Sequence, residues 1–136
     1  MSTESIISKE VTLLLLEQAQ AASTVGKFLD SALPGLLKLS RAEGLAVVES
    51  IPPEWKTHGS AGEVPKSLPT DLAAEALDRM AVARSQGWVA LPLDATQVLL
   101  VHGKPAAETI TVLQSGLSAT LRLVDEQQQR RQRIRR

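Results

Sequence analysis

The 136-residue sequence contains no cysteine, which excludes a disulfide framework, thiol catalysis and metal sites built on thiolates. Aromatic residues are also scarce: there are Phe28, Trp55 and Trp88, and no tyrosine. The core must therefore consist of Leu, Val, Ile and Ala side chains. Surfaces that bind single-stranded nucleic acid use aromatic side chains to stack on bases, so this scarcity argues against such a function.

The sequence also lacks any apolar run long enough to cross a membrane. The run LLLL at 13–16 is short and lies between Glu10 and Glu17. The first ten residues, MSTESIISKE, are polar and carry two acidic groups, unlike the basic start of a signal peptide. We therefore predict a cytoplasmic protein that has no membrane partner.

Recognisable catalytic motifs are absent as well. The glycine-containing stretch THGSAGE has neither the spacing of a P-loop nor its Lys-Ser/Thr ending, and no nucleophile elbow or dinucleotide fingerprint occurs. The two histidines, His58 and His102, have no cluster of carboxylates or further histidines nearby in the sequence, whereas metal sites need several converging ligands. The sequence therefore predicts a chain that is not an enzyme and has no metal or cofactor.

Charge is balanced overall but unevenly distributed. The net charge is zero, yet six arginines follow residue 121, against Asp125 and Glu126. The C-terminal stretch VDEQQQRRQRIRR could bind phosphates through these arginines, but it also suits a solvated helix end, where cations are favourable. We expect nucleic acid to be an unlikely partner.

Hydrophobic periodicity predicts an α+β fold, with an antiparallel β-sheet flanked by helices and with long helices at both ends. The short turn between the last two strands favours antiparallel pairing. The predicted elements are a helical region from 4 to about 41 with a bend or a restart at Pro34, strands at 44–50 and 54–59, a helix over 70–86, strands at 88–94 and 96–103, and a last helix that begins at Pro105.

The two terminal helices carry mainly apolar residues at alternating spacings of three and four, from Ile7 to Phe28 and from Ile110 to Val124, and the second series continues through the polar Gln127 and Arg131 to Ile134. This near-heptad spacing predicts a parallel homodimer held by both helices. The side chains predicted at the dimer interface are Val11, Leu14, Val25, Ile110, Leu113, Leu117 and Val124.

Between about residues 24 and 128 the sequence resembles a GAF-type sensory domain of bacterial signalling proteins. The resemblance depends on the strand patterns Val89 to Pro92 and Val98 to Val101, and on a final helix with Leu113, Leu117, Leu121 and Val124. PAS domains have a similar composition. The stretch from Thr57 to Pro69, where relatives often build a ligand lid, is short, and the motif of cyclic-nucleotide-binding members is absent.

The resemblance implies a sensory or regulatory domain, such as that of a sensor histidine kinase, whose last helix continues as a coiled coil into a kinase or cyclase output module. It divides the chain into a dimerisation helix (1–23), a sensory domain (24–122) and the start of a signalling helix (123–136). A small-molecule ligand, if one binds, is expected between the sheet and the 70–86 helix, near Trp88, His102 and His58. The alternatives are a stand-alone dimerising adaptor without a ligand and a nucleic-acid-binding protein that uses the arginine tail.

Overall fold

The computed structural model describes the backbone of residues 3–134 and the side chains of residues 9–131. The predicted seam residues Ile7 and Ile134 and the last arginine side chains lie outside the described side chains. Within residues 3–134, four helices and five strands follow one another: α1 (Thr3–Ala21), α2 (Val25–Ser40), β1 (Gly44–Ile51), β2 (Glu54–Gly62), α3 (Thr70–Arg79), β3 (Ala83–Ser85), β4 (Trp88–Pro92), β5 (Gln97–His102) and α4 (Ala107–Ile134).

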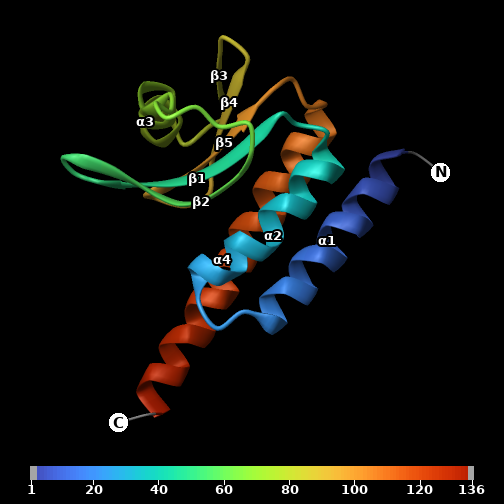
Figure 1. Cartoon of the computed structure of the whole chain (residues 1–136), viewed down its shortest axis with the longest axis vertical. Helices are drawn as coiled ribbons and strands as arrows, with labels where there is room; N and C mark the ends of the chain where they lie inside the picture. Colours follow the sequence, from blue (N-terminus) through green and yellow to red (C-terminus); the bar gives the residue numbers. More distant parts are fainter. Residues whose placement is uncertain (1–2, 135–136) are drawn as a thin grey trace.

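The strands form one antiparallel sheet with the order β2-β1-β5-β4-β3 (Figure 1). The hairpins β1–β2, β3–β4 and β4–β5 join neighbours in sequence, and β1 pairs with β5 at the centre. The paired strands β4 and β5 confirm the antiparallel pair predicted from their short connection. Pro92 is the last residue of β4, where its missing N–H costs no central ladder bond.

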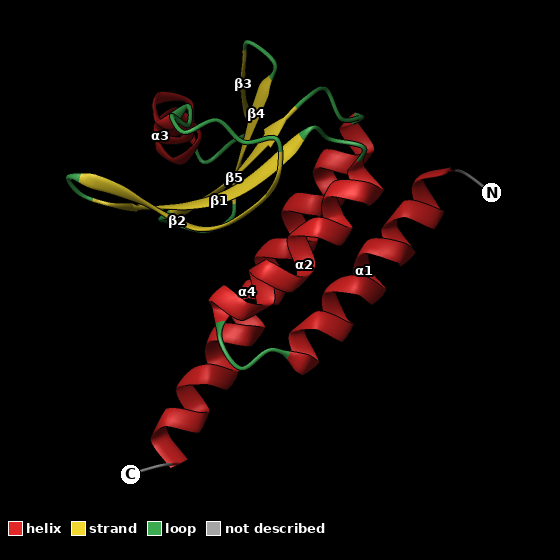
Figure 2. Ribbon diagram, viewed as in Figure 1, coloured by secondary structure: helices red, strands yellow, loops and turns green. Residues whose placement is uncertain are grey.

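Helices cover both faces of the sheet (Figure 2). On one face α2 and α4 pack against the strands and α1 packs on the outer side of these two helices, and on the other face α3 packs alone. Successive side chains of β1 point to opposite faces of the sheet, and this explains the two helical layers. Leu45 and Val47 point to the core beneath α2 and α4, whereas Ala46 and Val48 point to α3. The larger core also takes in Phe28, Leu29, Leu33, Leu36, Leu91, Leu99, Leu113 and Leu117, and the smaller one Leu72, Ala73, Ala76, Ala90, Val98 and Leu100.

The N-terminal helical region is broken at residues 22–24, and the prediction of a bend or a restart at Pro34 is wrong. The hydroxyl of Thr24 accepts a hydrogen bond from the N–H of Lys27 at 3.1 Å and caps α2. Pro34 lies inside α2 without ending it. The apolar spacing runs through the break, so the hydrophobic pattern alone gave no sign of it.

The third helix is shorter than predicted. It ends at Arg79, because Met80 takes a left-handed conformation and its N–H bonds back to the carbonyls of Ala76 and Leu77. Residues of the predicted helix end instead form β3, which turns into β4 through Gln86 and Gly87. Both turn residues have positive φ, as in the type I′ turns that suit two-residue hairpins.

No helix within the described part of the chain is both long and apolar enough to cross a membrane.

Candidate functional site

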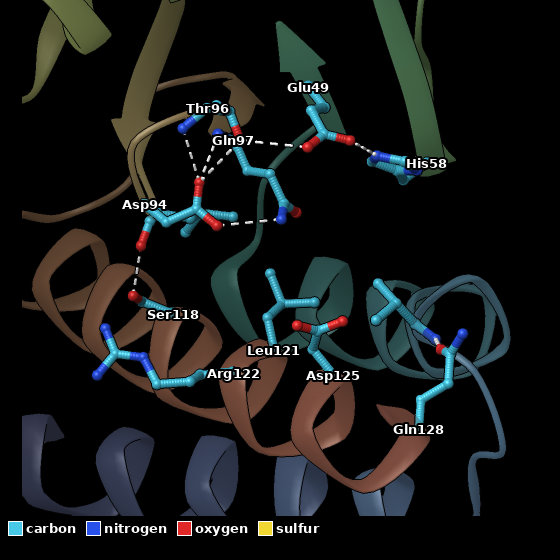
Figure 3. A pocket seen from close by; sticks show the side chains of 12 residues that line it. Glu49, His58, Asp94, Thr96, Gln97, Ser118, Leu121, Arg122, Asp125 and Gln128 are labelled. Atoms are coloured by element: carbon cyan, nitrogen blue, oxygen red, sulfur yellow. Dashed lines mark hydrogen bonds and ion pairs between the residues drawn. The ribbon is translucent and has the colours of Figure 1, made fainter. Parts of the chain in front are cut away.

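A polar cleft of about 460 Å³ lies where the sheet meets the middle of α4 and the start of α2 (Figure 3). Its size is within the usual range of small-molecule sites. Side chains from β1, β2 and the β4–β5 turn form one wall, and side chains of α4 form the other. The lining residues are Val25, Glu49, His58, Leu93, Asp94, Thr96, Gln97, Ser118, Leu121, Arg122, Asp125 and Gln128.

A β-bulge brings His58 into the polar cleft. Val48 of β1 pairs with Thr57 and Val47 pairs with Gly59, so His58 is an extra residue in β2. Bulges of this kind change the direction in which a side chain points. Here His58 Nε2 lies 2.7 Å from Glu49 Oε1, and both side chains are about three-quarters buried.

The β4–β5 turn is organised by one carboxylate. Asp94 Oδ1 accepts hydrogen bonds from the backbone N–H groups of Thr96 and Gln97 at 2.8 and 2.7 Å, which is an Asx turn. Asp94 Oδ2 accepts another from Gln97 Nε2 at 3.1 Å. The Thr96 hydroxyl also lies 3.2 Å from Glu49 Oε2, which joins the turn to the His58–Glu49 pair.

Helix α4 is attached to the same turn from the other side. Gln114 Nε2 donates to the carbonyl of Pro92 at 3.0 Å, and the Ser118 hydroxyl donates to the carbonyl of Leu93. Nearly three turns after Ser118 along α4, at about 3.6 residues per turn, Gln128 Oε1 accepts from the backbone N–H of Val25, the first residue of α2. Helix α4 is therefore hydrogen-bonded both to the β4–β5 turn and to the start of α2, at the edges of the polar cleft.

The polar cleft is acidic. Among its described lining residues, three carboxylates (Glu49, Asp94 and Asp125) face a single permanently charged base, Arg122. Figure 3 shows the Asp125 carboxylate directed into the cleft beside Leu121, with Arg122 toward the Asp94 end. Despite these carboxylates, no group of three or more His, Asp or Glu residues in the described chain is placed to hold a metal ion.

The order of the hydrogen bonds does not suit nucleophilic catalysis. In a catalytic triad a histidine lies between the nucleophilic hydroxyl and the carboxylate, where it takes the hydroxyl proton. In the polar cleft the carboxylate of Glu49 lies between the Thr96 hydroxyl and the His58 ring. The carboxylate therefore holds the turn and the bulge together, and His58 is not positioned to activate Thr96.

The residues predicted to bind a ligand do not form one group. Trp88 and His102 are cross-strand neighbours whose rings stack with centroids 4.5 Å apart, on the face of the sheet that α3 covers. His102 Nε2 also lies 3.6 Å from Glu43 Oε2. His58 points to the opposite face, near the other end of β1, so the expectation that it joins Trp88 and His102 is wrong.

The side chains predicted at a dimer interface lie largely within the chain's own core. Five of the seven are at most 4 % exposed, and Leu14 and Val25 pack against the same cluster. The reason is that α2 and α4 pack on the sheet and α1 packs on α2 and α4, which buries these side chains inside the chain. The five buried residues are Val11, Ile110, Leu113, Leu117 and Val124.

Most residues of the polar cleft were not predicted from the sequence, apart from His58. They come from five separate stretches, and none of these carries a motif. One local signal was present: the sequence D-x-T-Q after a strand ending in Pro92 is typical of an Asx turn, in which an aspartate binds the N–H groups that follow it.

The fold is similar to that of a solved GAF domain. The crystal structure of the GAF domain from Acinetobacter phosphoenolpyruvate-protein phosphotransferase matches with a TM-score of 0.70 at 12% sequence identity, over 91% of this chain and 93% of that chain. No protein-family model matches the sequence, and no curated protein matches it. The chain therefore has the GAF fold, which confirms the resemblance and the α+β class predicted from its strand and helix patterns.

Proposed function

We propose that this chain, which has the fold of a GAF domain, is a sensory or regulatory domain without catalytic activity, and that α4 passes its signal to an output module such as a histidine kinase or a cyclase. The observation that carries the proposal is the attachment of α4 to the polar cleft. Five residues of α4 line it, and Ser118 and Gln114 bind the backbone where β4 leaves the sheet.

The shape of α4 supports a role in transmission. It runs along the sheet and α2 and then extends beyond both, as Figure 1 shows. A rearrangement of the β4–β5 turn would change the contacts of Ser118 and shift or rotate the helix. Small helix shifts of this kind are a common means of coupling a binding site to a distant module.

The relay is tested in a chimera that joins α4, after Ile134, to a cyclase module. Ser118→Ala removes the hydroxyl that binds the Leu93 carbonyl, so we expect cyclase activity to change by roughly twofold or more, as the loss of one hydrogen bond implies. Ser115→Ala is the matched control, because its hydroxyl bonds only to the Thr111 carbonyl within α4. If the two variants gave the same activity as the parent, the stand-alone adaptor would be the better account.

We further propose that the domain acts as a homodimer, since output modules of this kind work in pairs. The contact would use the outer face of α1, where Leu13 and Leu16, three residues apart, are 60% and 45% exposed. Light scattering at tens of micromolar should give about twice the 14.6 kDa of one chain.

The double substitution Leu13→Glu with Leu16→Glu should give a folded monomer. Met80→Glu, at an exposed apolar side chain beside α3, should leave the dimer intact. A monomeric parent protein would rule this dimer out.

A further inference from the structure

We infer that the polar cleft binds a small organic cation: a short aliphatic chain that ends in an ammonium or guanidinium group. The polar cleft lies on the sheet face that α2 and α4 cover, opposite to α3 and to the Trp88–His102 stack.

The charges of the polar cleft favour a cation. With His58 neutral, the described lining residues carry three carboxylates and one guanidinium, which leaves an excess of negative charge. A cleft lined by charges of one sign concentrates small ions of the other sign. Glu49 on the sheet side and Asp125 on the α4 side face the cleft from opposite walls, so a cation between them would meet both.

The hydrogen-bonding groups favour a ligand with several N–H donors. Gln97 Nε2 is committed to Asp94, which fixes the orientation of the amide and leaves Oε1 as the acceptor. That oxygen is shielded from solvent and, within the described part of the chain, has no hydrogen-bond partner. Buried acceptors are nearly always paired, so a turn of the Gln97 side chain toward the cleft would let a ligand N–H satisfy a group that the protein leaves unsatisfied.

Apolar side chains complete the site. Leu121 lies on the floor of the polar cleft between the Gln97 amide and the Asp125 carboxylate (Figure 3). Leu93 and Val25 also line the space. These three side chains suit a short alkyl segment, whereas a bare inorganic cation would gain nothing from them.

Histidine resonances give a test with an internal control, because the chain has two histidines and only His58 lies in the polar cleft. The full chain is titrated with agmatine, which carries a guanidinium and an ammonium group on a four-carbon chain, and the ring C–H signals are followed by NMR. We expect saturable shifts of the His58 signals and none of His102. The experiment reads binding alone, so it does not depend on α4 passing a signal onward.

Two matched variants test whether the cation binds beside Asp125. Asp125→Asn keeps the shape of an exposed side chain and should weaken agmatine binding roughly twofold to fivefold, as expected for the loss of a solvent-screened ion pair. Asp78→Asn, an exposed aspartate on α3, should leave the affinity unchanged.

Three results would overturn the inference. The first is no shift of His58 at about 10 mM agmatine, roughly tenfold above a dissociation constant of about 1 mM. The second is an equal response of His58 and His102, or equal effects of the two variants. The third is tighter binding of the dianion glutarate than of agmatine.

Discussion

The direction of one side chain, that of His58, decides which groups meet in the polar cleft. In a regular strand the alternation of β2 would place His58 and Gly59 on opposite faces, but with the bulge both lie on the α2 side of the sheet, where His58 meets Glu49. The sequence identified His58 as a candidate because histidines are rare in this chain. It could not show the direction of the ring, since a bulge depends on how two strands pair.

The spacing of the apolar residues could not show whether they pack within their own chain or against a second chain. The positions of Leu113 and Leu117 were correctly recognised as apolar faces of a helix, and both are fully buried. Near-heptad spacing is equally suited to a partner within the chain and to a second chain. Here α1 and the sheet supply the partner, and Gly116 lets α1 approach closely, because an added Cβ would lie 3.0 Å from the Leu15 side chain.

The hydroxyl of Thr24 is expected to stabilise the start of α2. Thr24→Ala removes the acceptor of the Lys27 N–H and should lower the free energy of unfolding by about 0.5–2 kcal/mol. Ser23→Ala changes the neighbouring exposed hydroxyl and should have a smaller effect. Urea denaturation of both variants measures the difference, and equal stability would mean that α2 does not depend on this cap.

Among the elements, the central strands were predictable and the ends of the helices were not. β1, β4 and β5 combine β-branched or leucine residues with nearby turn residues, and their assignments agree with the structure to within a few residues. The helix ends depend on single caps: Thr24 at the start of α2 and Met80 at the end of α3. Hydrophobic periodicity does not detect either cap. The sequence therefore predicted a single helical region in place of α1 and α2, and it did not predict β3.

Helix α4 serves two purposes along its length. Its first half fills the core with Ile110, Leu113 and Leu117, whereas from Ser118 onward it also lines the polar cleft. The apolar spacing of the sequence predicted the first role. The second depends on Ser118, Asp125 and Gln128, which resemble any polar residues on the solvated side of a helix.

At the scale of the whole molecule, the fold could be predicted from patterns of local sequence, whereas the polar cleft could not. The order of helices and strands restricts a chain of this length to few arrangements, and the GAF fold is one of them. The polar cleft requires five stretches between Val25 and Gln128 to meet at one end of the sheet. Such a meeting follows from the tertiary packing of the sheet on α2 and α4.

The central claim is that α4 responds to the state of the β4–β5 turn, and amide hydrogen exchange of an Asp94→Ala variant tests it most directly. The substitution removes the acceptor for the Thr96 and Gln97 N–H groups and loosens the carbonyls that Gln114 and Ser118 bind. We predict that the amides of α4 from 114 to about 125 exchange roughly twofold to tenfold faster than in the parent protein, as expected from losing one or two hydrogen bonds, while those of β1 do not change. Faster exchange confined to residues 93–97, or spread evenly over the chain, would contradict the claim.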